Sequence, residues 1–274
     1  MLSIIIPANN EGPLIGECLS AVLASSRPEK AEVIVVANGC SDDTEDRAQA
    51  FQVMAALMGW TLKVLSLPEG NKMKALNAGD AAATGQDRVY LDADVRVSPE
   101  LLGELNDALS QDRPVYASGK LNISPAQSRA TQAYRRIYQR VPFIRKGVPG
   151  AGVFAVNGPG RARWGEFPNI ISDDTFVRLQ FMPGERVGVA AGYDWPLVEG
   201  FKNLVRVRRR QNAGVREISV KYPALSANDD KEGLGIFEIL RLALSDPEGF
   251  LVYAGVALIV KLTPQSSAAW GRGR

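Results

Sequence analysis

The sequence contains no histidine, and this absence restricts the chemistry that the chain can carry out. Without imidazole there is no Ser-His or Cys-His nucleophile and no His-ligated zinc or iron site. Carboxylates, lysine, tyrosine and cysteine remain for acid–base chemistry. Cysteine is also scarce, because Cys18 and Cys40 are the two present. They form no disulfide framework and favour a reducing compartment.

An excess of charge and an export signal are missing as well. The 274 residues contain 32 Lys and Arg against 30 Asp and Glu, a formal net charge of +2. With one local basic stretch and no recognised binding motif, this balance argues against a nucleic-acid partner. The first residues, Met1 to Pro7, lack a basic region and a long apolar stretch. They predict a first strand and not an export signal, so we expect a cytoplasmic protein.

Short apolar runs alternate with helical patterns in the first half of the chain. The strand-like runs lie at residues 4–6, 33–36, 62–65 and 89–91, and the segments between them repeat apolar residues every three to four positions. This alternation predicts βαβ units, and therefore a mainly parallel sheet with helices on both faces. Ligands bind at the carboxyl ends of the strands in such sheets, so the polar residues after each run are the site candidates.

The fourth run ends in Asp92-Ala93-Asp94. Residues i and i+2 of an extended chain point the same way, so two carboxylates converge where a hard divalent cation finds oxygen ligands. A polar turn after a buried strand is the alternative interpretation. Lys72 lies in the first turn of a helix initiated by Gly70, an arrangement that suits an anion such as a diphosphate.

A pair of acids and a basic stretch mark the second half. The acids Asp173 and Asp174 follow Ser172 at the start of a helical pattern, where they also suit the N-cap and the helix dipole. The basic stretch has three interpretations: a solvated face, a patch on a lipid surface, or arginine forks that clamp a diphosphate. It contains Lys202, Arg206, Arg208, Arg209, Arg210, Arg216 and Lys221.

The end of the chain carries an amphipathic pattern at residues 234–245 and eleven uncharged residues at 250–260. Eleven residues are well short of the ~20 that cross a bilayer. Two interpretations stay open for 234–262, a core helix that packs back on the domain and an interfacial helix on the inner face of the cell membrane. The neighbouring cationic stretch favours the membrane surface, because anionic lipid attracts clustered Lys and Arg.

Taken together, the motifs resemble those of the inverting family 2 glycosyltransferases. Four of them occur in the family's order and spacing, at Ser3–Glu11, Val35–Thr44, Lys72 with Ala75–Gly79, and Asp92–Asp94. The resemblance continues less strongly through Gly150-Ala151-Gly152 and Ser172–Thr175 to about residue 215. It implies a GT-A fold, a Rossmann-like α/β architecture, over residues 1–222. A nucleotide-sugar-binding half would span 1–112, an acceptor-side half 113–222, and a C-terminal helical segment 223–274.

The resemblance also implies the roles of individual residues. Asp94 and Asp92 would hold Mg²⁺ or Mn²⁺, and Asp174, in preference to Asp173, would be the general base. The remaining candidates would bind the nucleotide sugar: Pro7, Asn9, Glu11, Asn38, Lys72 and Asp92, together with Arg209 and Arg210 on the basic stretch.

Two positions depart from the family pattern and bear on the donor. Asn9 stands where the family often has an aromatic residue, and Asn38 stands where it usually has Asp. The Asn38 side chain offers both an acceptor and a donor, which match the edge of uracil. The paired N–H donors of guanine prefer a carboxylate, so a UDP-sugar is favoured over a GDP-sugar.

The predicted reaction is a single displacement that adds one sugar to a hydroxyl acceptor. It needs one carboxylate base and one cation, which agrees with the lack of histidine. The Gln-x-x-Arg-Trp motif of processive members does not occur. The apolar C-terminal pattern favours a lipid-linked glycan or an exopolysaccharide intermediate as acceptor. Two rivals are a non-catalytic nucleotide-sugar-binding partner of a membrane synthase and a sugar-phosphate nucleotidyltransferase. The latter needs a glycine-rich, arginine-bearing loop where this chain has Asn9-Asn10-Glu11.

Overall fold

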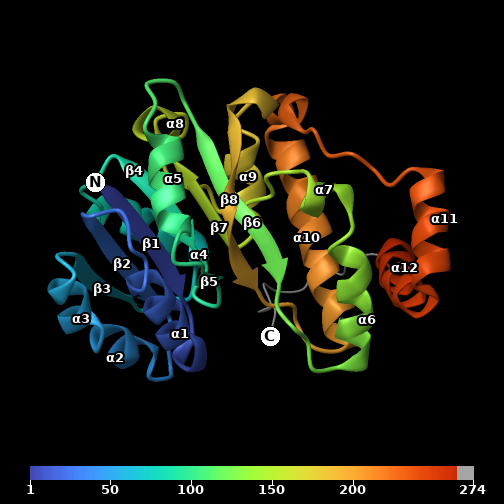
Figure 1. Cartoon of the computed structure of the whole chain (residues 1–274), viewed down its shortest axis with the longest axis horizontal. Coiled ribbons are helices and arrows are strands. Elements are labelled where there is room, and N and C mark those ends of the chain that lie inside the picture. The colour runs from blue at the N-terminus through green and yellow to red at the C-terminus, as the bar shows by residue number, and fades with distance from the viewer. Residues whose placement is uncertain (264–274) are drawn as a thin grey trace. The chain divides into compact units, whose positions relative to one another are not determined.

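A computed structural model describes residues 1–263. The last part of the predicted segment 223–274, residues 264–274, lies outside the described residues. The chain forms two compact units (Figure 1). The first consists of Met1–Leu121 and Val148–Trp195, and the second of Asn122–Gly147 and the chain from Pro196 onward.

An eight-stranded sheet in the order β3-β2-β1-β4-β7-β6-β8-β5 is the framework of the first unit (Figure 1). β1 pairs in parallel with β2 and β4, and β2 pairs in parallel with β3. The pairs β4–β7, β6–β7 and β5–β8 are antiparallel, so the sheet is mixed. The strands are β1 (Leu2–Ala8), β2 (Ala31–Asn38), β3 (Thr61–Leu67), β4 (Asp87–Leu91), β5 (Arg96–Val97), β6 (Tyr116–Ile123), β7 (Val153–Val156) and β8 (Arg186–Trp195).

Helices cover both faces of this sheet, as the alternating pattern predicts. Every residue of β1 and β2 is buried, which requires cover on both sides of these strands. Ile34 and Val36 of β2, for example, pack with Ala75 of α4. The helices of the unit are α1 (Gly12–Leu23), α2 (Thr44–Gln49), α3 (Gln52–Leu57), α4 (Lys72–Ala82), α5 (Leu101–Leu109), α8 (Gly158–Arg161) and α9 (Asp173–Arg178).

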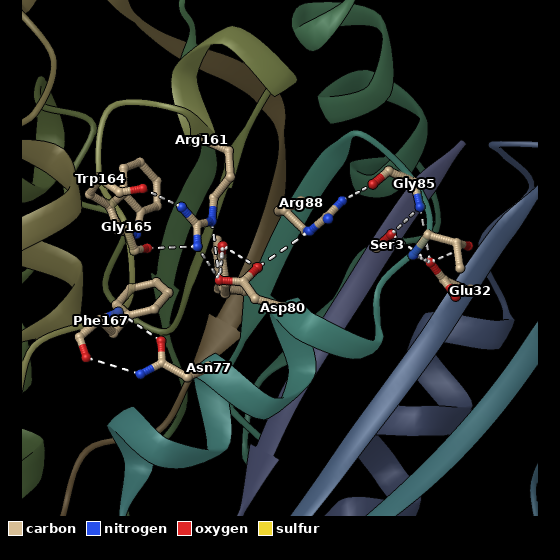
Figure 2. A network of polar contacts seen from close by, with 12 residues as sticks. Ser3, Glu32, Asn77, Asp80, Gly85, Arg88, Arg161, Trp164, Gly165 and Phe167 are labelled. Atoms are coloured by element: carbon tan, nitrogen blue, oxygen red, sulfur yellow. Dashed lines mark hydrogen bonds and ion pairs between the residues drawn. The ribbon is translucent and has the colours of Figure 1, made fainter.

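A buried carboxylate ties together the amino ends of the parallel strands (Figure 2). Glu32 accepts hydrogen bonds from Ser3 Oγ at 2.8 Å, from Thr84 Oγ1 at 2.9 Å and from the Gly85 N–H at 3.1 Å. Desolvation opposes the ionised form, but the hydrogen bonds from Thr84, Ser3 and Gly85 lower the pKa of Glu32 to about 2. This end of the sheet is therefore closed by internal bonds, and the opposite, carboxyl end carries the candidate residues.

The second unit is helical. Its core joins Tyr134, Leu204, Val205 and Val256, one or more from each of three helices that pack together. The unit contains α6 (Arg129–Tyr138), α7 (Pro142–Arg145), α10 (Phe201–Lys221), α11 (Ile236–Ser245) and α12 (Pro247–Leu262). Within residues 1–263, no helix combines the length and the apolar character that a bilayer crossing requires.

Close packing between α4 and β1 gives a prediction about stability. A Cβ at Gly79 would overlap Ile5 Cγ2, whereas a Cβ at Gly16 of α1 would meet Phe51 at an ordinary 3.9 Å. Gly79→Ala will lower the free energy of unfolding by about 1–3 kcal/mol through overpacking. The control Gly16→Ala will leave it unchanged or raise it by up to about 1 kcal/mol through helix propensity. Urea unfolding of both variants measures the difference, and equal stabilisation by the two substitutions would contradict the packing.

Candidate functional site

A buried amide joins the loops at the carboxyl ends of β1 and β2 to the start of α4. Asn38 Nδ2 donates to Ala8 O at 2.8 Å and to Val36 O at 3.2 Å, and its Oδ1 accepts from the Asn71 N–H at 3.0 Å. The side chain of Asn38 therefore supports three chain segments at once. Its predicted contact with the nucleoside stays a prediction.

Asn9 lies beside Asn38, and one oxygen of its side chain has no hydrogen-bond donor among the described residues. Its Nδ2 donates to the backbone oxygens of Asn38 and Gly39. Its Oδ1 is buried, and no donor among the described residues reaches it. Buried acceptors are normally satisfied, so this oxygen would gain a hydrogen bond if a shift of the loop let a ligand donor reach it.

Hydrogen bonds also join the loops after β1 and β2 beyond Asn9 and Asn38. The Glu11 N–H donates to Thr44 Oγ1 at 2.8 Å, and the Gly12 N–H donates to Asp42 at 3.0 Å. Desolvation opposes the charge on Asp42, but hydrogen bonds from Thr44 and Gly12 lower its pKa. Pro7 is buried within β1, and Glu11 stands at the N-cap of α1. Both candidates thus lie at this edge of the sheet, Pro7 as part of the strand and Glu11 in the loop.

Lys72 is the centre of the charged part of the site. Its Nζ lies 2.8 Å from Asp92 Oδ1 and 3.0 Å from Asp173 Oδ2. Burial alone would lower the pKa of Lys72, but the negative charges of Asp173 and Asp92 raise it above its usual value. The fold thus brings together three predicted residues that are far apart in the sequence.

Asp92 and Asp94 follow β4 directly, where the sequence predicts a cation site. Mg²⁺ and Mn²⁺ favour carboxylate oxygens, and Mg²⁺ is commonly held by one or two carboxylates together with substrate phosphates and water. Within residues 1–263 there is no cluster of three or more acidic, cysteine or histidine ligands that would enclose an ion by itself. The role of Asp92 and Asp94 as cation ligands stays a prediction.

The acidic pair begins α9, as expected, and its two members differ. Asp173 is buried and paired with Lys72, whereas Asp174 is half-buried and accepts a hydrogen bond from the Thr175 N–H at 2.7 Å. Burial and the neighbouring charge of Asp173 raise the pKa of Asp174 to about 6, although Lys72 opposes the rise. The pKa of Asp174 thus lies above that of an ordinary aspartate.

Sequence reasoning assigned no role to two tyrosines that support the site. The Asp92 N–H donates to Gly152 O at 2.8 Å, so the glycine-containing loop before β7 contacts the end of β4. This loop is held by Tyr193 Oη, which donates to Ala151 O at 2.8 Å, and by Tyr116 Oη, which donates to Pro149 O at 3.4 Å. The positive φ of Gly150 and Gly152 explains the glycines of the motif. The spacing of the two glycines marked this loop in the sequence, but nothing in the sequence indicated that the two tyrosines hold it.

Two predicted residues belong to the other unit. Arg209 and Arg210 lie on α10, and Arg209 donates a hydrogen bond to Thr263 Oγ1. All the other candidates lie in the first unit. A diphosphate clamp by Arg209 and Arg210 stays a prediction.

Known structures share this architecture at low sequence identity. A mannosyltransferase from Pyrobaculum calidifontis, solved with GDP-Man and Mn²⁺, has 18% identity and a TM-score of 0.61, over 96% of this chain and 76% of its own. S. aureus TarS 1-349 with UDP-GlcNAc has 16% identity and a TM-score of 0.57, over 96% and 76%. Glucosyl-3-phosphoglycerate synthase from Mycobacterium tuberculosis, solved with Mn²⁺ and UDP-Glc, has 19% identity and a TM-score of 0.55, over 85% and 82%.

These likenesses confirm the predicted α/β fold of the GT-A type. A search of the curated proteins gives no match. The family model described as Glycosyl transferase family 2 matches residues 3–162, which is more than half of the chain. The chain therefore belongs to glycosyl transferase family 2 and is a glycosyltransferase.

Proposed function

We propose that the chain is an inverting, metal-dependent and non-processive glycosyltransferase that moves one sugar from a nucleotide sugar to a hydroxyl group. The observation that carries this proposal is the position of Lys72 between Asp92 and Asp173. One ammonium group thereby joins the predicted donor-side carboxylate to the predicted acceptor-side pair. Such proximity is what a direct transfer between two bound substrates requires.

The chemistry follows from these groups. The acceptor oxygen attacks the anomeric carbon from the face opposite the nucleoside diphosphate, the new glycosidic bond forms, and the bond to the diphosphate breaks. The proton of the acceptor hydroxyl passes to a carboxylate base. Asp94 and Asp92 would hold the cation. When bound, Mg²⁺ or Mn²⁺ neutralises negative charge on the leaving diphosphate.

Asp174 is the better base of the acidic pair. Asp173 Oδ2 already lies 3.0 Å from Lys72 Nζ, so this carboxylate is engaged in an ion pair. The pKa of Asp174, about 6, lies nearer to the working pH than that of an ordinary aspartate. A base with a pKa close to the working pH combines a useful ionised fraction with a useful proton affinity.

The buried Oδ1 of Asn9 supports a uridine donor. Uracil presents a single N–H on its pairing edge, which one amide oxygen can accept. Guanine presents two adjacent N–H donors, which suit a carboxylate better. The similar structures were solved with both GDP-Man and UDP-sugars, so the fold alone does not select the base. In this proposal Pro7, Glu11 and Asn38 shape the nucleoside pocket.

Two substitutions test the mechanism. With UDP-sugars, Mn²⁺ and a hydroxyl acceptor, Asp174→Asn will lower kcat by about 10²- to 10⁴-fold because no base takes the proton. It will keep the rise in Tm that UDP and Mn²⁺ cause. Asp94→Ala will lose that Mn²⁺-dependent rise. The matched control Asp107→Asn, which alters an exposed carboxylate paired with Arg27, will behave as the wild type.

The pH dependence of the wild type is part of the same test. Because Asp174 must be ionised to accept a proton, kcat will be full above a pH of about 6 and will fall as the pH is lowered through that value. Unchanged transfer in both Asp94→Ala and Asp174→Asn would refute the mechanism. A wild type that binds UDP but neither transfers nor hydrolyses the sugar would instead support the non-catalytic binding partner. Formation of a nucleotide sugar from a sugar phosphate would support the nucleotidyltransferase.

We also propose that α11 and α12 contact a membrane and that the acceptor is lipid-linked or an exopolysaccharide intermediate. Arg136 anchors the turn between these helices with bonds of 2.6 and 3.0 Å to Asp246, and Arg140 donates to Ser245. Val256 of α12 is buried, but other large apolar side chains of the two helices are exposed. Exposed apolar surface of this extent is typical of a contact site. It includes Ile236, Phe237, Leu240, Leu244, Leu251, Leu258 and Leu262.

Vesicle binding tests this contact. The wild type will co-sediment with vesicles of phosphatidylcholine and phosphatidylglycerol, and Phe237→Ser with Leu244→Ser will weaken the binding because less apolar area is buried. The matched control is Val53→Ser with Leu57→Ser, which alters side chains on α3 that are similarly exposed. The control will bind as the wild type does. Equal loss in the two double variants, or no binding by the wild type, would contradict the proposal.

A further inference from the structure

Both ends of one downstream segment are held by helix α4. We call this segment, residues 167–173, the strap. At its far end Asp173 pairs with Lys72 at the start of α4, at 3.0 Å. At its near end Phe167 is bonded to Asn77, which is also on α4 (Figure 2). All of these residues belong to the first unit.

The bond between Asn77 and Phe167 is reciprocal. Asn77 Nδ2 donates to Phe167 O at 3.0 Å, and Asn77 Oδ1 accepts from the Phe167 N–H at 2.7 Å. The side-chain amide of Asn77 thus satisfies both the backbone N–H and the backbone carbonyl of Phe167. The Phe167 ring is buried and packs edge-on against Tyr90 of β4, with ring centroids 5.3 Å apart. The near end of the strap is therefore fixed by hydrogen bonds and by packing.

A second anchor on α4 holds the chain just before the strap (Figure 2). Asp80 accepts from Arg161 Nη2 at 2.9 Å and from Tyr90 Oη at 2.8 Å. The same guanidinium donates to Trp164 O at 2.7 Å and to Gly165 O at 2.9 Å. The path from α8 to Phe167 is thus tied to α4 as well.

Simple geometry shows why the anchor at Phe167 matters. Lys72 and Asn77 are five residues apart, which is roughly 7.5 Å along a helix. A strap that spans six residues can reach roughly 20 Å when it is extended. The strap is therefore longer than the distance that it has to cover, and its length alone does not fix its path. The clamp at Asn77 fixes the near end of this path, and the buried Phe176 and Val177 hold α9 after the acidic pair.

We infer that Asn77 is a positioning residue, which sets the acceptor-side pair Asp173 and Asp174 against the donor-side carboxylate Asp92 through α4. This inference rests on the proposed function, because it gives the pair a part in the transfer. Asn77 itself touches neither substrate. Its effect is on the geometry of the base, and donor binding depends on other loops.

The test compares two asparagines that each hold backbone groups: Asn77, which is half-buried, and Asn157, which is buried. Asn77→Asp keeps the acceptor for the Phe167 N–H but places a carboxylate oxygen against Phe167 O. Asn157→Asp makes the same change away from the site, where Asn157 Nδ2 donates to Gln111 O at 2.9 Å and to Arg113 O at 2.7 Å. The control thus loses two donated bonds, against one in Asn77→Asp, and costs at least as much stability.

The two variants should differ in three measurements. Asn77→Asp will lower kcat by about 10- to 100-fold, because a displacement of the order of 1 Å is that costly. Its Kd for UDP with Mn²⁺ will stay at the wild-type value, and the amide hydrogens of residues 167–174 will exchange faster. Asn157→Asp will keep the wild-type kcat and the protection of residues 167–174. Should Asn77→Asp not fold, Asn77→Ser removes the clamp without adding a charge.

Opposite results would overturn the inference. It fails if residues 167–174 keep their protection without Asn77, or if kcat falls equally in Asn77→Asp and Asn157→Asp. It also fails if Kd for UDP rises as much as kcat falls. Hydrogen exchange needs no substrate, so a wild type without transfer activity would refute the proposed function while exchange still tested the strap.

Discussion

The arrangement of the site depends on one positively charged side chain, the ammonium group of Lys72. Four aspartates, Asp92, Asp94, Asp173 and Asp174, come from two distant parts of the chain and gather at one end of the sheet. Carboxylates brought together in a partly buried place repel one another and resist ionisation. By pairing with Asp92 and Asp173, Lys72 offsets this repulsion and links β4 to α9.

Most of the other contacts keep Lys72 in its place. Asn38 bonds to the Asn71 N–H immediately before it, and Asn71 Oδ1 caps the helix by accepting from the Lys74 N–H. Further along α4, Gly79 permits close packing on Ile5 of β1. At the other end of the sheet Glu32 closes the strand ends with internal bonds. The framework is thus rigid on both sides of a site that must hold its charges at fixed separations.

Local patterns were sufficient to predict the parallel half of the sheet and the residues at its edge. Short helices connect the strands β1 to β4 along the chain, so periodicity in the sequence indicates each of these elements in turn. It also put Asn9, Asn38 and Asp92 at the same edge. The antiparallel half was beyond such reasoning, because β4 and β6 pair with β7 outside the alternation of strands and helices from which parallel pairing follows. No pattern in the sequence indicated that Asn77 meets Phe167 or that Tyr193 meets Ala151.

In the clamp between Asn77 and Phe167, the strap contributes only the backbone N–H and the backbone carbonyl of Phe167. A bond to a peptide group does not depend on which side chain that peptide carries. The exposed Asn169 and the half-buried Pro168, Ile171 and Ser172 can therefore change while the two ends of the strap keep their anchors, whereas Ile170 is buried in the core. In the proposed mechanism these positions lie between the clamp and the acidic pair, so they can diverge in evolution without a matching change in Asp173 and Asp174.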